Sequence, residues 1–439
     1  MSRADPGPDS QAARALSPTR RKVEAGLARR YGRERRFRVF GLVSVLFGIA
    51  FLAFLLVSIV GNGYPAFRQT CIRLDIDFDR ALLDAAGTGD RAVLGAADYQ
   101  ALIRAALEEL VPEADDRRAR RELRSLVSSM ASYELRDRVL ADPELLGQRR
   151  TLWLPADDAV DMLVKGHAGR TTAEGGQLSA RQLAWTDRLR ADGRMALRFN
   201  RAFFTAGDSR EPEMAGIWGA TVGSFFMLLV TLLLSFPLGV AAAIYLEEFA
   251  PRNRWTDFVE VNINNLAAVP SVIFGLLGLA VFINFFGLPR SAPLVGGLVL
   301  TLMTLPVIII ASRAAIKAVP PSVREAALGI GASPMQTVFH HVLPLALPGM
   351  LTGAIIGLAR ALGESAPLLM VGMVAFVVDV PGSPLDPSTA LPVQVYLWAD
   401  SPERAFIERT SAAIMVLLAF LLVMNATAVW LRSRFERRW

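Results

Sequence analysis

The chain has 439 residues, of which 53% are hydrophobic, and its 47 Lys and Arg against 41 Asp and Glu give a formal net charge of +6. This composition is too apolar for an ordinary soluble enzyme, and one cysteine excludes an internal disulfide or a cysteine metal cluster. Three histidines leave little material for a metal site. We therefore expect no metal site and no catalytic residue, and the charge excess is only a weak argument for nucleic-acid binding.

The hydrophobic residues gather in long stretches. A helix needs about 20 apolar residues to cross a bilayer. Five stretches of at least this length contain no Asp, Glu, Lys or Arg, and a sixth, 345–378, is interrupted only by Arg360 and Glu364. We predict an all-α integral membrane protein with six crossings. The stretches without Asp, Glu, Lys or Arg are residues 39–60, 214–246, 261–289, 291–312 and 410–430.

The first stretch resembles a secretory signal only superficially. Its apolar run is longer than the apolar core of a signal, and no small-x-small cleavage site follows it. We interpret residues 39–61 as a retained transmembrane helix. Residues 1–38 carry eleven Lys or Arg against four acids, and residues 431–439 carry four Arg against one Glu. The positive-inside rule then predicts that both termini lie in the cytoplasm.

Residues 62–213 separate the first two crossings and form an inserted domain, which we expect outside the cytoplasm. Long charged segments of this kind are translocated whatever their charge. The segment 99–110 has the apolar spacing of a helix, while 151–154 and 159–164 could be short strands or further helix. We expect a mainly helical domain, with α+β as a possible variant. Its role stays open.

The segment 320–344, between the fourth and fifth crossings, predicts two short helices. Ser322 precedes Glu325 by three residues, which is the spacing of a capping box, and Gly331 is suited to close that helix. Ser333 begins a second box with a proline at the first helical position. This helix-turn-helix suits a groove in a partner protein. The alternative is an amphipathic connector that lies on the membrane.

This loop resembles the EAA loop of ABC-importer permeases. In that family the loop acts as the coupling helix, which docks into a cytoplasmic ATPase. His341 stands where the family usually has Ile or Val. The residues that carry the resemblance are Glu325, Ala326, Ala327, Gly331, Leu343 and Pro344.

Arg360 and Glu364 are the two charges of the fifth crossing, and their spacing predicts that they share one helix face. A charge in hydrocarbon costs at least about 2.5 kcal/mol, so the pair should face the bundle interior or a wet path. A guanidinium presents N–H donors in a fixed fork that suits tetrahedral oxyanions. The pair therefore predicts a substrate path, and the alternative is a structural ion pair. By contrast, Glu247 and Glu248 are interpreted as part of a solvated loop.

Four segments of the chain, beginning at Ala268, Ala359, Leu391 and Arg434, resemble the permeases of the bacterial phosphate ABC importer. The segments that begin at Leu391 and Arg434 resemble its A-type subunit. The resemblance covers residues 214–439, and the inserted domain resembles a variant of some bacterial members. Pro270 should kink the third crossing. Many members have an Arg near Ile310, and here the nearest is Arg313, so the second cation of the path stays open. The segments are Ala268 to Gly278, Ala359 to Leu369, Leu391 to Tyr396 and Arg434 to Trp439.

The resemblance implies a type I permease of six helices in the bacterial cytoplasmic membrane. Its implied partners are a C-type second permease, two ATPase subunits, an extracytoplasmic phosphate-binding protein, phosphate and membrane lipid, with no nucleic acid. The chain contains no P-loop, so we expect it to bind no cofactor and a partner ATPase to use ATP. Two alternatives stay open: a permease for molybdate, sulfate or phosphonate, and a membrane sensor.

Overall fold

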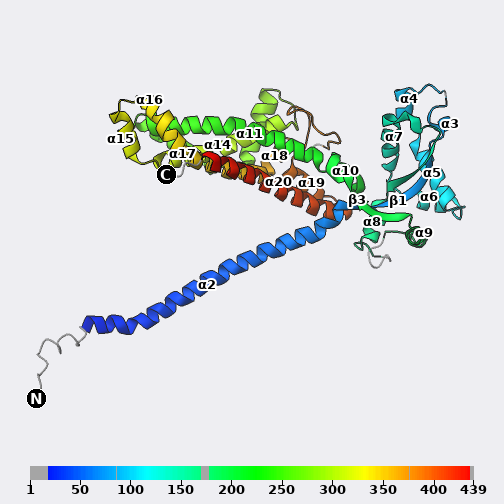
Figure 1. Ribbon diagram of the computed structural model, residues 1–439, viewed down its shortest axis with the longest axis horizontal. Helices are drawn as coiled ribbons and strands as arrows, with labels where there is room; N and C mark the ends of the chain where they lie inside the picture. Colours follow the sequence, from blue (N-terminus) through cyan, green and yellow to red (C-terminus); the bar gives the residue numbers. More distant parts are fainter. Residues whose placement is uncertain (1–17, 86, 170–176, 375, 436–439) are drawn as a thin grey trace, which may run out of the picture. The chain divides into compact units, whose positions relative to one another are not determined.

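The computed structural model describes residues 18–85, 87–169, 177–374 and 376–435. Residues up to Ile59 form one unit and Val60–Trp439 form another. The first unit holds most of helix α2, Pro18–Gly63, which contains the first predicted crossing and is drawn at the blue end of the chain (Figure 1). Residues 1–17 of the basic segment 1–38, and residues 436–439 of the segment Arg434 to Trp439, lie outside the described residues.

The inserted domain contains a three-stranded antiparallel sheet in the order β2-β1-β3. The central strand β1, Arg68–Asp77, pairs with β2, Arg149–Pro155, and with β3, Met195–Phe199. Of the two segments for which the sequence left strand or helix open, 151–154 is therefore a strand, whereas 159–164 is helical. The helices are α3 Arg80–Leu83, α4 Arg91–Ala96, α5 Tyr99–Leu110, α6 Arg117–Arg124, α7 Ala131–Ala141, α8 Asp158–Val164, α9 Ala180–Ala191 and α10 Arg201–Thr205, and the short 3₁₀ turns are η1 Tyr64–Phe67, η2 Pro143–Leu145 and η4 Pro212–Met214.

The alternation of side chains along β1 divides the sheet into an apolar and a polar face. Ile72, Leu74 and Ile76 are completely buried in the domain core, which they share with leucines of α5, α6 and α7. The intervening residues of β1 lie on the opposite face, as the period of two in a strand requires. Aspartate N-caps begin several helices of this domain, including α5 at Asp98 and α6 at Asp116.

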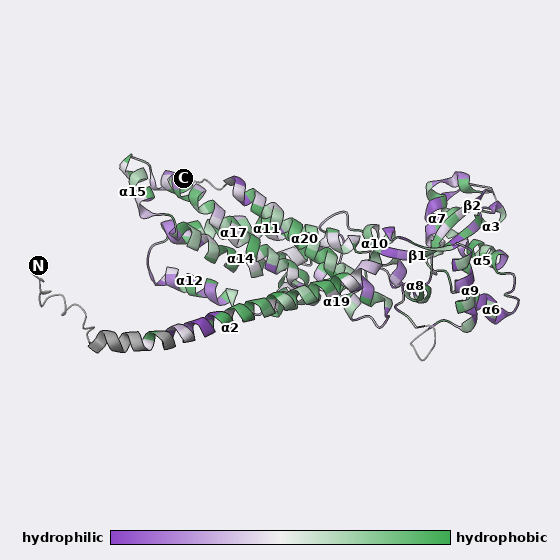
Figure 2. Ribbon diagram, turned by 60° about the horizontal axis from the view of Figure 1, so that its bottom comes forward, coloured by the Kyte–Doolittle hydropathy of each residue, from purple (hydrophilic) through white to green (hydrophobic). Residues whose placement is uncertain are grey.

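The second half of the chain is a bundle of long apolar helices. Helices α11, α14, α17 and α20 lie side by side (Figure 1), and apolar residues dominate α11, α14 and α20, whereas polar residues are frequent on α6 and α9 (Figure 2). The elements are α11 Trp218–Ile244, η5 Tyr245–Phe249, α12 Arg254–Ala267, α13 Ser271–Gly278, η6 Leu279–Phe285, α14 Pro293–Lys317, α15 Pro321–Gly329, α16 Pro334–Thr337, η7 Val338–Val342, α17 Leu343–Gly363, α18 Ala366–Met370, α19 Leu391–Ala399 and α20 Ala405–Phe435.

Small residues allow these helices to approach closely. A Cβ atom placed on Gly297 of α14 would lie 2.7 Å from Val230 Cβ and 2.8 Å from the carbonyl oxygen of Met227, both in α11. Glycine at this position therefore lets the two backbones pack in contact, as is common between membrane helices. One buried core of the bundle contains residues of α11, α13, η6, α14, α17, α18 and α19.

The structure differs from the prediction at the third and the fifth crossing, because neither is one continuous helix over its predicted stretch. Within the described residues, five helices are long and apolar enough to span a membrane, or six if the bent pair α12 and α13 is one span. That pair turns by 100° at Pro270, so the stretch 261–289 is broken rather than merely kinked. The fifth helix, α17, ends at Gly363 instead of continuing to 378. Pro367 would clash with the carbonyl of Gly363 in a continuous helix, which explains this end.

Candidate functional site

The loop 320–344 forms a compact turn of short helices between α14 and α17. Helix α15 ends at Gly329, and Gly331 follows with φ of +93°. Glycine adopts this left-handed conformation without steric cost. The turn is closed by the backbone N–H of Ala332, which donates to the carbonyl of Ala327 at 3.1 Å.

The two predicted helix caps of this loop differ. At Ser333 the capping box forms, since Ser333 Oγ accepts from the Gln336 N–H at 3.2 Å and Gln336 Oε1 accepts from the Ser333 N–H at 2.9 Å. The predicted box at Ser322 is wrong. Helix α15 begins at Pro321 with Pro320 in the N-cap position, so Ser322 lies inside the first turn. Proline at the first helical position has the backbone φ of a helix already fixed, and the helix starts two residues earlier in the chain than predicted.

Apolar side chains project from the loop into solvent. Leu328, Ile330 and Met335 are 50%, 82% and 58% exposed, and Phe339 is also exposed. Glu325 and Ala326 are exposed beside them, while Ala327 is buried. Leu343 and Pro344 are half-buried at the start of α17. We name Leu328, Ile330, Met335 and Phe339 the loop apolar patch. A gathering of apolar side chains of this kind is typical of a protein interface.

An ion-pair network, which the sequence interpretation missed, holds the loop against α11. Arg324 of α15 makes a bidentate contact with Glu248, with Nη2 at 2.6 Å from Oε1, and donates to the carbonyl oxygens of Val319 and Ile316 at 2.9 and 3.1 Å. Glu248 lies in the π-helical turn η5 at the end of α11 and is largely buried. The interpretation of Glu247 and Glu248 as a solvated loop is therefore wrong.

Arg313 extends this network and is not a free cation. Its Nε lies 3.3 Å from Glu247 Oε2, and its Nη2 contacts Glu260 of α12. Lys317 reaches Glu247 as well, at 3.5 Å. A signal in the sequence could have revealed these pairs. Glu247 and Glu248 follow one apolar stretch and Arg313 and Lys317 follow another, and both groups are predicted to lie on the same side of the membrane.

Arg360 and Glu364 meet at the end of α17. Arg360 Nε lies 3.6 Å from Glu364 Oε1, and the two side chains are 47% and 24% exposed. Arg360 belongs to the last helical turn, whereas Glu364 is the C-cap residue with extended backbone. The pair therefore forms, although not on one continuous helix face. Within the described part of the chain, Glu364 is the ion-pair partner of Arg360, so the exposed guanidinium has further N–H donors that can bind an anion.

Two family models match the chain. Residues 235–439 match the model described as the binding-protein-dependent transport system inner membrane component. Residues 24–174 match a domain of unknown function, DUF3333, which includes most of α2 and much of the inserted domain.

Similar proteins include the probable ABC transporter permease protein YqgI of Bacillus subtilis, which is 33% identical over 54% of this chain and 84% of its own length. The phosphate transport system permease protein PstA 1 of Mycobacterium tuberculosis is 30% identical over 52% of this chain and 74% of its own length. Among solved structures, an inward-facing MetNI methionine ABC transporter matches 50% of this chain and 98% of its own, at 20% identity and a TM-score of 0.42.

Proposed function

The chain belongs to the family of binding-protein-dependent permeases, the multi-pass membrane subunits of ABC importers, and from this premise we propose that it forms the phosphate path of an importer. The similarity to a phosphate transport permease over about half of the chain carries this proposal. The exposed guanidinium of Arg360 supports an oxyanion as substrate.

The loop 320–344 is proposed to couple transport to ATP hydrolysis in a partner. The residues that form the docking element are Glu325, Ala326, Ala327, Gly331, Leu343 and Pro344, with Ser333 as cap. The loop apolar patch would enter a groove of the ATPase, and burial of four apolar side chains would drive that association. Movement of the ATPase pair would then shift the bundle between inward-facing and outward-facing states.

Arg360 and Glu364 are proposed to line the path. The carboxylate at 3.6 Å orients the guanidinium and reduces the net charge of the site, so that an anion can bind and leave. Pro270 would hold the turn between α12 and α13.

The proposed assembly contains a PstC-type second permease, two ATPase subunits and an extracytoplasmic phosphate-binding protein. ATP is bound by the ATPase subunits, and this chain binds no cofactor. We propose that both termini lie in the cytoplasm of a bacterial cell and the inserted domain outside it, because basic residues dominate both terminal segments. A substrate such as molybdate, sulfate or phosphonate is the second candidate, since guanidinium chemistry suits each of these oxyanions.

The test is ATP-dependent uptake of radiolabelled phosphate by proteoliposomes that contain this chain with its partners. We expect uptake in the wild type and at least a tenfold loss in Arg360→Gln at unchanged assembly. Arg252→Gln is the matched control, because Arg252 is exposed in a connection between helices. Equal uptake by the wild type and Arg360→Gln would show that the pair is structural. Absence of phosphate uptake in an assembled transporter, with uptake of another oxyanion, would replace the substrate.

A further inference from the structure

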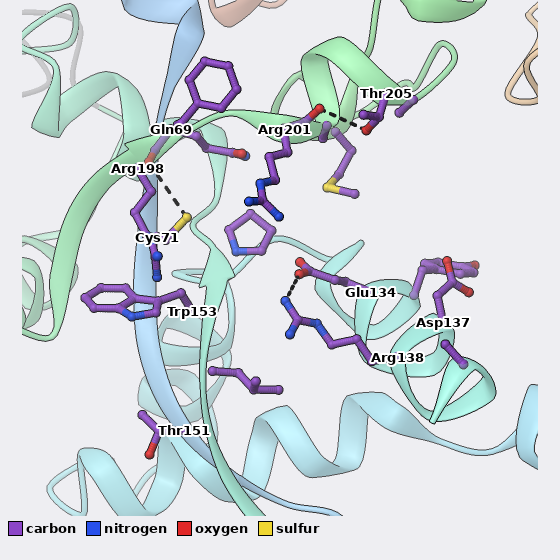
Figure 3. Close-up of a pocket in the computed structure, with 18 residues that line it drawn as sticks. Gln69, Cys71, Glu134, Asp137, Arg138, Thr151, Trp153, Arg198, Arg201 and Thr205 are labelled. Atoms are coloured by element: carbon purple, nitrogen blue, oxygen red, sulfur yellow. Dashed lines mark hydrogen bonds and ion pairs between the residues drawn. The ribbon is translucent and has the colours of Figure 1, made fainter. Parts of the chain in front are cut away.

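A cavity of about 940 Å³ lies in the inserted domain on the polar face of the sheet (Figure 3). Strand β1 contributes Gln69 and Cys71, and β2 contributes Trp153, while α7 and α10 form walls. The volume lies within the range of about 300–1,000 Å³ that is typical of small-molecule sites. It far exceeds the volume of a single tetrahedral ion, so the cavity suits a larger molecule.

The acidic side chains that α7 places at the cavity are both held in ion pairs. Glu134 Oε1 lies 2.6 Å from Arg138 Nη2. Asp137 pairs with Arg136 at 2.9 Å. Both carboxylates of α7 thus have an arginine partner, although Arg136 itself does not line the cavity.

Two arginines of the cavity wall are left without an acidic partner. Among the described residues, neither Arg198 of β3 nor Arg201 of α10 makes an ion pair. Both side chains extend towards the cavity, Arg201 at its centre and Arg198 along Trp153 (Figure 3). Burial raises the pKa of the Cys71 thiol to about 12, so the nearby sulfur stays neutral. The lining therefore contains three arginines, Arg138, Arg198 and Arg201, against the two acids Glu134 and Asp137, an excess of one positive charge.

Trp153 orients the first of these arginines. The guanidinium carbon of Arg198 lies 5.1 Å from the centre of the Trp153 ring, and that of Arg73 lies 5.9 Å from it. Arg73 and Trp153 face each other in the register of β1 and β2, while Arg198 faces Gln69 across β1 and β3. Contact with an aromatic ring restricts a guanidinium and leaves its in-plane N–H groups free for an anion.

We propose that this cavity binds a phosphomonoester. Arg198 and Arg201 hold the phosphate group, because guanidinium forks suit a tetrahedral dianion. The organic part lies against Trp153, Tyr133 and Phe199, which supply apolar and aromatic surface beside the two cations. The proposal does not depend on the transport function, since the cavity is built from residues of the inserted domain alone apart from Met214 at its margin.

The test is direct binding of phenyl phosphate to the full chain in nanodiscs of neutral lipid, measured by isothermal titration calorimetry. We expect the double variant R198Q/R201Q to bind at least tenfold more weakly. Arg190→Gln is the matched control, because Arg190 is an exposed arginine of α9 outside the cavity. Thermal unfolding of each variant establishes that the fold is retained.

Further binding measurements distinguish which molecule supplies the phosphate group. Inorganic phosphate should bind more weakly than phenyl phosphate, and Trp153→Leu should remove that difference. Competition by phosphatidic acid in the nanodisc, dependent on both arginines, would support the proposal with a lipid as the source. Phenyl phosphate binding that is unchanged in R198Q/R201Q, undetectable in the wild type, or no tighter than that of inorganic phosphate would overturn it.

Discussion

Lys165 of the inserted domain and Glu408 of the last membrane helix form a buried ion pair, with Nζ 2.7 Å from Oε1 and exposed fractions of 4% and 6%. The same Nζ lies 2.7 Å from Asp161 Oδ2, and Asp161 Oδ1 accepts from the backbone N–H of Thr70. One ammonium thus joins α8, the central strand β1 and α20. The inserted domain is therefore held to the bundle by a buried polar contact.

Loss of this ammonium should be costly. Lys165→Met removes the ammonium from the buried carboxylates of Asp161 and Glu408 and leaves Glu408 only its 3.4 Å contact with His167 Nδ1. Breaking a buried pair costs about 3–5 kcal/mol. We expect a clear fall in the thermal unfolding temperature of the protein in detergent. Arg188→Met is the control, since the pair Arg188–Glu113 is exposed and such pairs contribute about 0–1 kcal/mol. The double variant K165M/E408Q should recover part of the loss, and equal unfolding of K165M and R188M would contradict the prediction.

Glu213 should make stability depend on pH. The side chain is 2% exposed, and burial raises its carboxyl pKa from 4.5 to about 7. The folded protein holds this proton more tightly than the unfolded chain, so the contribution of Glu213 to stability is fully present below pH 4.5 and is lost as pH rises through about 7. A shift of this size corresponds to about 3 kcal/mol.

Glu213→Gln mimics the protonated carboxyl and should remove this dependence. We expect the variant to exceed the wild type in stability at pH 8 by up to about 3 kcal/mol and by much less at pH 5. Denaturation at several pH values measures the difference, with the exposed Glu144→Gln as control. A difference that stays constant between pH 5 and pH 8 would refute the prediction.

Arg324 should position the coupling loop. Its bidentate contact with Glu248 fixes α15 against the end of α11, and its bonds to the carbonyl oxygens of Ile316 and Val319 fix α15 against the end of α14. Arg324→Glu places two carboxylates together, and we expect at least a tenfold loss of ATP-driven uptake. The exchange R324E/E248R should restore part of it. Uptake by Arg324→Glu equal to that of the control Arg252→Gln would show that the contact does not position the loop.

Close packing of α11 on α14 should tolerate no side chain at Gly297. Gly297→Ala places a methyl group 2.8 Å from a backbone oxygen of Met227, and overpacking costs about 1–3 kcal/mol. We expect a lower unfolding temperature than in Gly363→Ala, where nothing lies within 4 Å of the added Cβ. Thermal unfolding in detergent compares the two variants. Equal unfolding temperatures of Gly297→Ala and Gly363→Ala would contradict the prediction, because they would show that α11 and α14 accommodate the added methyl group without loss of stability.

Local sequence determined much of this protein. The apolar spacing at 99–110 gave the bounds of α5, and the long uncharged stretches gave most of the membrane helices. The spacing of Ser333 and Gln336 gave a cap that forms. These features depend on energies between residues a few positions apart, which are present wherever the segment lies.

The tertiary structure alone decided the remaining features. Pro237 and Pro306 lie inside continuous helices while the chain turns at Pro270, so a proline by itself does not determine a break. Arg324 and Glu248 are 76 positions apart, and Arg198 and Trp153 meet only because β3 and β2 flank one strand. Such pairs form because the packing of the whole chain brings the two residues together. The local sequence around either residue therefore does not predict the contact.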